Sequence, residues 1–210
     1  PGALLVTRIA VVDHGAGNLV SIARGLERSG AEVVVVEHAG GFADADGVVL
    51  PGVGTTGAAM ERLEAADMIN PLRAWDGPLL GICVGLQLLF DSSEEQGGTD
   101  GLGLMSGTVR KLVTAPLLPH IGWNDVTTNG HPIFAGIPSG TPFYFVHSYA
   151  PVPDDPAVVA ATTEYGDRFV AAAADGPRVG VQFHPERSGT AGLQLLANFV
   201  AIAGADARAA

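Results

Sequence analysis

Cysteine and basic residues are both scarce in this chain. One of its 210 residues is a cysteine, Cys83. A single thiol excludes an internal disulfide framework and a zinc site built from several thiolates, and it fits a reducing compartment. The chain has 11 Lys and Arg against 22 Asp and Glu, a net charge of -11. With no basic stripe to displace counterions from a phosphate backbone, nucleic acid is not expected as a partner.

Long apolar runs are missing as well. No segment is long enough to span a bilayer, and residues 1–6 lack the basic and apolar regions of a signal peptide. We therefore expect a cytoplasmic protein that does not enter the membrane. Hydrophobic residues make up 47% of the chain and charged residues 16%, which is typical of a globular protein. The length favours one domain, residues 1–210, over two.

The first half alternates apolar segments with helix-like ones. The predicted strands are residues 8–13, 31–37, 47–50 and 79–82, and the predicted helices are residues 19–28 and 55–66. Strands that are apolar throughout and alternate with helices indicate a parallel sheet covered on both faces.

The pattern changes from Gly103 onward, where turns separate strand-like segments. These segments are residues 108–113, 124–128, 143–150, 158–163, 168–173 and 178–182. We predict a largely antiparallel extension, closed by a helix at about residues 192–203.

The segment Gly81-Ile82-Cys83-Val84-Gly85 follows a predicted strand and leads into an apolar, helix-like segment at residues 86–90. Glycines on either side of a cysteine between strand and helix are typical of a nucleophile elbow, a turn too crowded for a Cβ. The helix N-terminus there favours a thiolate, the form of cysteine that attacks. Cys83 is therefore a candidate nucleophile. On this motif alone, an inert buried thiol explains the cysteine equally well.

A second glycine-rich segment, residues 50–57, contains Gly-x-Gly-x-x-Gly between a strand and a helix. A dinucleotide-binding loop has this form but belongs after the first strand, whereas this is the third, and the expected acidic residue is missing. A better interpretation is that the backbone N–H groups of Gly52 and Val53 form an oxyanion hole with that of Val84. The alternative is an ordinary turn.

A cysteine nucleophile needs a base and a group that orients the base. The histidines are His14, His38, His120, His131, His147 and His184. None is paired at His-x-x-x-His spacing, so we expect no metal site. His184 follows an apolar strand, and Glu186 lies two residues beyond it, where its carboxylate can reach the imidazole. A capping histidine and a surface glutamate are the alternative, but Cys83 favours a triad.

These motifs together resemble the class I (triad-type) glutamine amidotransferases. Three further segments, residues 13–18, 119–124 and 144–149, are similar to the glutaminase subunits of imidazole glycerol phosphate synthase. The resemblance covers residues 9–199. The chain differs from the usual family pattern at His14, Val84, Leu86 and Arg187, and none of these differences removes a catalytic group.

The resemblance implies a three-layer, flavodoxin-like α/β fold with a mixed central sheet, helices on both faces and an antiparallel extension. It implies hydrolysis of L-glutamine to glutamate and ammonia by Cys83, His184 and Glu186, without a cofactor. It also implies that the amino-acid end of the substrate is held by Gln87 and Glu95, together with the main chain near Ser148 and Tyr149. Without the family, Gln87 is a polar helix residue and Glu95 an exposed acid.

The resemblance further implies a heterodimer with a (β/α)8-barrel cyclase subunit. That subunit uses the ammonia to convert N'-(5'-phosphoribulosyl)formimino-AICAR-phosphate to imidazole glycerol phosphate and AICAR in histidine biosynthesis. The matching interface residues are Asn18, Trp123, Tyr144 and Arg187. Core packing is the alternative for Trp123 and Tyr144.

Three other functions are compatible with parts of the sequence. The chain could serve an amidotransferase for another acceptor, as in the vitamin B6 or anthranilate systems, although residues 119–124 are not expected there. It could be a catalytically silent binding module on the same fold, against which the intact Cys83, His184 and Glu186 argue. A cysteine peptidase would need an open cleft, whereas Gln87 and Glu95 suggest a small amino acid as substrate.

Overall fold

The computed structural model describes residues 6–15, 17–42 and 44–208. Residues 1–5, most of the segment considered for a signal peptide, and Ala16 of the 13–18 motif lie outside the described residues. Within the described part of the chain, no helix has both the length and the apolar character needed to cross a membrane.

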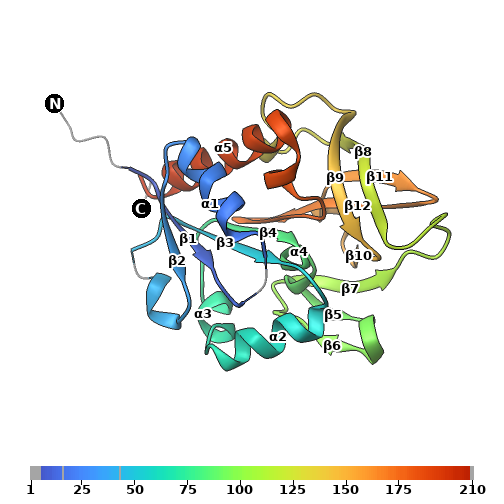
Figure 1. Ribbon diagram of the computed structural model, residues 1–210, viewed down its shortest axis with the longest axis horizontal. Coiled ribbons are helices and arrows are strands. Elements are labelled where there is room, and N and C mark those ends of the chain that lie inside the picture. Colours follow the sequence, from blue (N-terminus) through green and yellow to red (C-terminus); the bar gives the residue numbers. More distant parts are fainter. Residues whose placement is uncertain (1–5, 16, 43, 209–210) are drawn as a thin grey trace.

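A nine-stranded mixed sheet forms the centre of the molecule (Figure 1). Its parallel strands, in sheet order, are β2 (Glu32–Val36), β1 (Arg8–Val12), β3 (Gly47–Gly52), β4 (Leu79–Cys83) and β13 (Arg178–Val181). Taken in the order in which the chain enters this half, the arrangement is 2-1-3-4-5, which is the flavodoxin-like order. β3 and β4 are buried along their whole length, which explains their unbroken apolar sequences.

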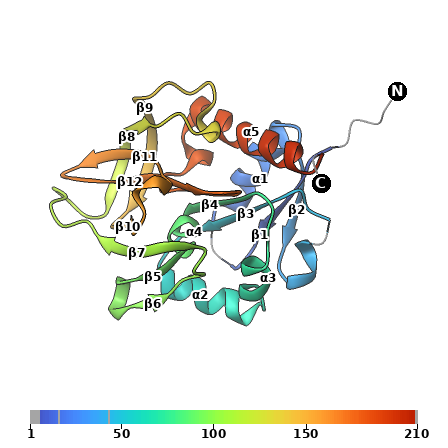
Figure 2. The same ribbon diagram turned by 180° about the vertical axis from the view of Figure 1, so that it is seen from behind.

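Helices cover both faces of the parallel half (Figures 1 and 2). On one face lie α1 (Leu19–Arg28) and α5 (Gly189–Asp206), and on the other α2 (Thr56–Ala65), α3 (Ile69–Arg73) and α4 (Val84–Leu88). Gly25 lets α1 approach α5 closely, because a Cβ at that position would lie 2.5 Å from Cδ1 of Leu196. The predicted three-layer α/β fold is confirmed.

The strands outside the parallel half are divided between two sheets, and their pairing is largely antiparallel. The central sheet continues past β13 through β12 (Asp167–Asp175), β11 (Val159–Tyr165), β8 (His120–Thr128) and β9 (Thr141–His147). A second sheet contains, in order, β10 (Tyr149–Pro153), β7 (Met105–Lys111), β5 (Phe90–Ser93) and β6 (Thr99–Asp100). Short 3-10 turns occupy Ala39–Phe42, Glu95–Gly97, Pro132–Phe134, Pro156–Val158 and Pro185–Arg187.

Two of the predicted antiparallel strands differ from the structure, one in its limits and one in its pairing. The segment predicted as one strand over residues 143–150 is two strands in different sheets, β9 and β10, which separate at Ser148. The Ser148 carbonyl accepts a hydrogen bond from Leu112 N, beside the second sheet. The last predicted strand, at residues 178–182, is β13. It pairs antiparallel with β12, as expected, but in parallel with β4, so it joins the extension to the parallel core of the fold.

The predicted helix at residues 86–90 is also wrong in its limits, because α4 spans Val84–Leu88 and Phe90 already begins β5. A segment distant in sequence ends this helix. Leu102 N donates to the Leu88 carbonyl, and Leu104 N and Met105 N both donate to that of Leu89. These bonds use carbonyls that a longer helix would need at its end.

Candidate active site

The turn from β4 into α4 has the backbone of a nucleophile elbow. Cys83 has φ 55° and ψ -109°, a left-handed conformation that residues with a side chain rarely adopt. The flanking glycines are required sterically. A Cβ on Gly81 would lie 2.6 Å from the Gly85 carbonyl oxygen, and one on Gly85 would lie 1.8 Å from the Leu50 carbonyl oxygen. The close approach of β3, β4 and α4 thus forces Cys83 into its strained position.

Cys83 is almost fully buried but opens onto a cavity of about 310 Å³, at the small end of the range for small-molecule sites. The cavity is lined by Val53, Gly54, Cys83, Val84, Gln87, Glu95, Pro119, Val146, His147, Ser148, Tyr149, His184 and Arg187. It lies at the carboxyl ends of the parallel strands, where ligands bind in open α/β sheets. Of the residues predicted to act in catalysis or substrate binding, Gly52 and Glu186 do not line it.

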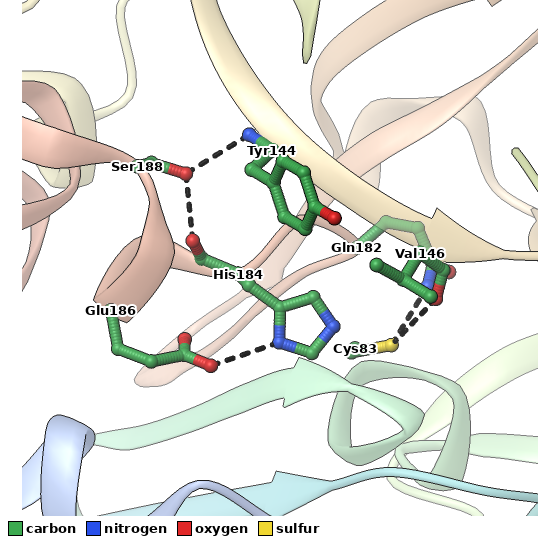
Figure 3. Close-up of polar contacts among 7 residues, drawn as sticks. All are labelled: Cys83, Tyr144, Val146, Gln182, His184, Glu186 and Ser188. Carbon is green, nitrogen blue, oxygen red and sulfur yellow. Dashed lines mark hydrogen bonds and ion pairs between the residues drawn. The ribbon is translucent and has the colours of Figure 1, made fainter. Parts of the chain in front are cut away.

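His184 and Glu186 form a buried pair beside Cys83 (Figure 3). The His184 Nδ1 lies 3.0 Å from Oε1 of Glu186, whose side chain is 1% exposed. Figure 3 shows the second ring nitrogen on the side that faces the Cys83 sulfur. Pro185 and Glu186 lie in a 3-10 turn, which brings the carboxylate back to the imidazole two residues earlier. The structure thus brings together the three residues predicted as a triad.

The backbone of His184 is braced against β9. His184 N donates to the Tyr144 carbonyl at 2.8 Å, and the Ser188 hydroxyl donates to the His184 carbonyl at 2.7 Å. The same hydroxyl accepts from Tyr144 N at 3.0 Å (Figure 3). Tyr144, predicted as an interface residue, therefore fixes the backbone that carries the imidazole. Nothing in the sequence motif indicated this link.

The charge state of His184 depends on its two neighbours. Burial lowers the pKa of His184, but its interactions with Cys83 and Glu186 outweigh burial and raise the pKa to about 10. The imidazole therefore carries its proton at neutral pH. A protonated imidazole next to a sulfur favours the thiolate, and it can give a proton to a leaving nitrogen.

Two polar groups contact the Cys83 sulfur from other strands (Figure 3). The thiol donates to the Val146 carbonyl at 3.7 Å, and Nε2 of Gln182 donates to the sulfur, also at 3.7 Å. Val146 lies in β9, and Gln182 directly follows β13. Neither residue was given a role from the sequence, because Val146 falls inside the predicted strand at residues 143–150 and Gln182 is the last residue of the one at residues 178–182.

The predicted oxyanion loop packs on the elbow. A Cβ on Gly52 would lie 2.8 Å from Cβ of Val84 and 2.9 Å from Gly85 N, so this position needs glycine. Val53 lines the cavity and is 41% exposed. His14, which follows β1, is buried and its Nε2 lies 2.7 Å from the Pro51 carbonyl oxygen. This contact ties Pro51 in β3, just before the oxyanion loop, to the loop that follows β1.

The residues predicted to hold the substrate all line the cavity, and the side chains of Gln87 and Glu95 are already hydrogen-bonded within the protein. Gln87 is buried in α4, and its Nε2 donates to the Tyr149 carbonyl at 2.9 Å. Tyr149 O is also in contact with His147 Nδ1 at 2.8 Å, so both acceptor positions of this carbonyl are used. Glu95 Oε2 accepts from the backbone N–H and the hydroxyl of Thr56, at the start of α2. Glu95 therefore acts as a cap of α2 at the cavity wall.

Of the predicted interface residues, Arg187 lines the cavity, and Tyr144 and Trp123 pack in line with it. Trp123 is 57% exposed, so core packing does not account for it. Its ring meets that of Tyr144 edge-on at 5.9 Å, and the Arg187 guanidinium lies 4.6 Å from the centre of the Tyr144 ring. Ile121, two residues before Trp123 in β8, is 60% exposed and was not anticipated. Asn18 is exposed at the start of α1.

Comparison with known proteins identifies the family. The chain matches the family described as "Glutamine amidotransferase class-I" over residues 10–203. It is 48% identical to the imidazole glycerol phosphate synthase subunit HisH of Moorella thermoacetica, over 91% of this chain and 93% of that protein. The HisH subunit of Yersinia pseudotuberculosis is 45% identical, over 91% and 98% of the two chains. This chain belongs to the HisH branch of the class I glutamine amidotransferases.

Solved structures with the same fold support the architecture of this HisH-family chain. A chain from Thermoplasma acidophilum described as a GMP synthase subunit has a TM-score of 0.75 at 23% identity, covering 99% of this chain and 98% of that one. The PurLQS structure from Thermotoga maritima has a TM-score of 0.71 at 20% identity, covering 94% and 99%. At these identities the likeness concerns the fold alone.

Within the described residues of this HisH-family chain, no group of three or more His, Cys, Asp or Glu side chains is arranged to hold a metal ion. His120 and His147, from paired positions of β8 and β9, contact each other at 3.2 Å between Nδ1 and Nε2. Burial lowers the pKa of His147 to about 3, although the Tyr149 carbonyl opposes this, so His147 stays neutral. It is a hydrogen-bonding group in the cavity wall.

Proposed function

We propose that this chain hydrolyses L-glutamine in the cavity between β4, β9 and β13 and passes the ammonia to a (β/α)8-barrel cyclase subunit. The observation that carries the proposal is one cavity containing Cys83 on a strained elbow beside the buried pair of His184 and Glu186. Membership of the HisH branch supports the substrate and the acceptor reaction. That reaction yields imidazole glycerol phosphate and AICAR in histidine biosynthesis.

In the proposed reaction, the Cys83 thiolate attacks the side-chain amide carbon of glutamine. The C=O electrons move to the oxygen, which meets the N–H groups of Val84 and of the Gly52–Val53 loop. His184 then gives its proton to the amide nitrogen, the C–N bond breaks, and ammonia leaves a glutamyl thioester. Water attacks the thioester, His184 takes up the proton, and the C–S bond breaks to release glutamate. Glu186 holds the imidazole in position and stabilises its charge.

The cavity wall offers partners for the amino-acid end of glutamine. We assign the ammonium group to the side of Glu95 and Gln87, and the carboxylate to the region of Ser148 and Tyr149. The Tyr149 carbonyl already accepts two contacts, from Gln87 and His147, so it is not available to the ammonium group. The backbone N–H groups of this region and the Ser148 hydroxyl are therefore assigned to the substrate carboxylate.

The exposed residues Ile121, Trp123 and Arg187, together with the half-buried Tyr144, support docking of the cyclase at the cavity mouth. Aromatic residues and arginine are the most frequent binding hot spots. Docking there would shield the cavity from bulk water, in which ammonia is mostly converted to ammonium and is no longer a nucleophile. Asn18 is a further residue of this proposed heterodimer interface. We propose the cytoplasm as the compartment, in keeping with the single cysteine.

The deciding experiment removes the sulfur. We expect Cys83→Ala to abolish glutamate release from glutamine in the complex with the cyclase. Synthesis from added ammonium salt should persist, because the cyclase site is unchanged. Glutamate release is measured with and without the cyclase and its nucleotide ligand. Glutamate release at the wild-type rate by Cys83→Ala would contradict the proposal, and failure of the variant to fold or to bind the cyclase would show that Cys83 is needed for structure.

A further inference from the structure

Gln182 is a fully buried polar residue at the centre of the site that the mechanism above does not use. It is 0% exposed and directly follows β13, and its backbone N–H donates to the Ala171 carbonyl at 2.8 Å. Its side chain joins two site residues. Oε1 accepts from Nε2 of Gln87 at 3.1 Å, and Nε2 donates to the Cys83 sulfur at 3.7 Å (Figure 3).

The Tyr149 carbonyl fixes the direction of this chain of hydrogen bonds. A carbonyl oxygen can only accept, so Gln87 must turn its NH2 group toward Tyr149, at 2.9 Å. The same NH2 group faces Gln182, which must therefore present its oxygen. The NH2 group of Gln182 is then left facing Cys83. The orientation of both amides follows from the network, which is the criterion by which such amides are assigned.

The two contacts of the sulfur respond in opposite ways to its ionisation. The Val146 carbonyl can interact favourably with the thiol, which donates to it, but not with a thiolate, which has no hydrogen to donate. The Gln182 amide donates to the sulfur, and such a bond is stronger when the acceptor is charged. Of these two neighbours, Gln182 alone favours the anion.

We propose that Gln182 is a further catalytic residue of this reaction, whose side-chain amide donates to the Cys83 sulfur and stabilises the thiolate, with Gln87 holding the amide in the required orientation. The inference rests on the proposed function, in which Cys83 is the nucleophile. Because Gln87 also lines the substrate end of the cavity, the orientation of Gln182 is coupled to a residue that we assign to glutamine binding.

The test compares two variants with a matched control. Gln182→Met has a similar length but no donor, and Gln182→Glu keeps an acceptor for Gln87 but places negative charge beside the sulfur. Gln194→Met is the control, because Gln194 is exposed on α5, where its amide contacts Asn198. Each variant is assayed in the complex with the cyclase. Circular dichroism of each variant and its co-elution with the cyclase on gel filtration report whether folding and docking are intact.

The main measurement is the rate of Cys83 alkylation by iodoacetamide as a function of pH. Cys83 is the single cysteine of the chain, so its peptide is identified unambiguously by mass spectrometry. We expect the midpoint of the pH profile to move upward by about one pH unit in Gln182→Met, and further in Gln182→Glu. The acidic limb of glutamine hydrolysis should move with it, while Gln194→Met matches wild type.

If both variants fold and the pH midpoint of Cys83 alkylation is unchanged, the inference is overturned, even if glutamine hydrolysis is slower. A residue that only fills space would change the rate of hydrolysis and not the ionisation of the Cys83 thiol. If neither variant folds, the unmutated chain decides. The side-chain amide NMR resonances of Gln182 should then titrate with Cys83 in wild type and lose that titration in Cys83→Ser, and resonances that do not titrate in wild type would overturn the inference. Failure of the proposed function is distinct, since wild type itself would then release no glutamate.

Discussion

Two histidines in the same cavity are driven to opposite charge states by their neighbours. Burial lowers the pKa of both, but His184 also meets Cys83 and Glu186, which raise its pKa to about 10. In the described part of the chain, no carboxylate is among the groups that act on His147. Burial, with His120 and His184, outweighs the Tyr149 carbonyl, which alone raises the pKa of His147, and the pKa falls to about 3. At neutral pH one imidazole is therefore a proton donor and the other is neutral. The presence of nearby anions, and not burial, separates their roles.

The raised pKa of His184 leads to a prediction about pH. Below about 10 the imidazole is protonated and can give its proton to the leaving nitrogen, and above it this capacity is lost. We expect wild-type glutamine hydrolysis to decline on the alkaline side near that value. In Glu186→Gln the alkaline limb of kcat/KM should move down by roughly 1–3 pH units, because an opposite charge raises a histidine pKa by that order.

The measurement for Glu186→Gln is the pH profile of glutamate release by the complex, from neutral to alkaline pH. Ammonium-dependent synthesis, recorded over the same range, is the control for effects of pH on the cyclase. We also expect kcat to fall by roughly 10²–10⁴-fold, because the orientation of the imidazole is lost. An alkaline limb that stays in place would show that Glu186 does not set the charge of His184.

At the scale of elements, the site depends on how closely β3, β4 and α4 approach one another. Three glycines, Gly52, Gly81 and Gly85, occupy the contacts, and each would place a Cβ within 3 Å of a neighbouring atom. This crowding holds Cys83 at its positive φ. The elbow is therefore a consequence of the packing of three elements, and the geometry at Cys83 should respond to any one of these glycines.

We expect Gly85→Ala to lower the free energy of unfolding by about 3 kcal/mol or more, because the added methyl group would overlap the Leu50 carbonyl and its site is well packed. Gly57→Ala, in α2, is the matched control. Its Cβ would meet nothing within 4 Å, and alanine is a better helix former than glycine, so its stability should be equal or up to about 1 kcal/mol higher. Denaturant unfolding measures both, and equal midpoints for the two variants would contradict this account.

At the scale of the whole molecule, the second half of the chain builds one wall of the active site. The central sheet runs from β2 at one edge to β9 at the other, and β9 supplies Val146 and His147 to the cavity and Tyr144 to its rim. Trp123 lies opposite Tyr144 in the paired strand β8. The proposed docking face and the active site thus share one pair of strands at one edge of the sheet.

This arrangement predicts that Trp123→Ala weakens docking of the cyclase more than it weakens folding. A hot-spot side chain contributes about 2 kcal/mol, which corresponds to a roughly 30-fold rise in the dissociation constant. Val35→Ala is the control, because Val35 is similarly exposed but lies in β2, at the opposite edge of the sheet. Titration of each variant with the cyclase gives the constants. Equal constants for the two variants would mean that the docking face lies elsewhere.

Much of the fold could be predicted from local sequence. The limits of α1 match the prediction at Leu19 and Arg28, and the apolar segments of β1 to β4 were placed within two residues. The site motifs around Cys83 and His184 were visible for the same reason, since an elbow and a short turn are built from neighbouring residues. Three features could not be predicted in this way: the limits of α4, the break at Ser148 and the parallel pairing of β13. Each is set by hydrogen bonds to distant segments.

The sequence by itself determined where most helices and strands lie, which glycines flank the elbow, and the family of the chain. These features depend on steric limits and on patterns within a few residues. Only the tertiary structure decided what surrounds the sulfur. Gln182 lies 99 residues from Cys83 along the chain and Val146 lies 63 residues away. Such contacts depend on which strands become neighbours in the sheet, and that choice is made by burial of the whole core and not by any local pattern.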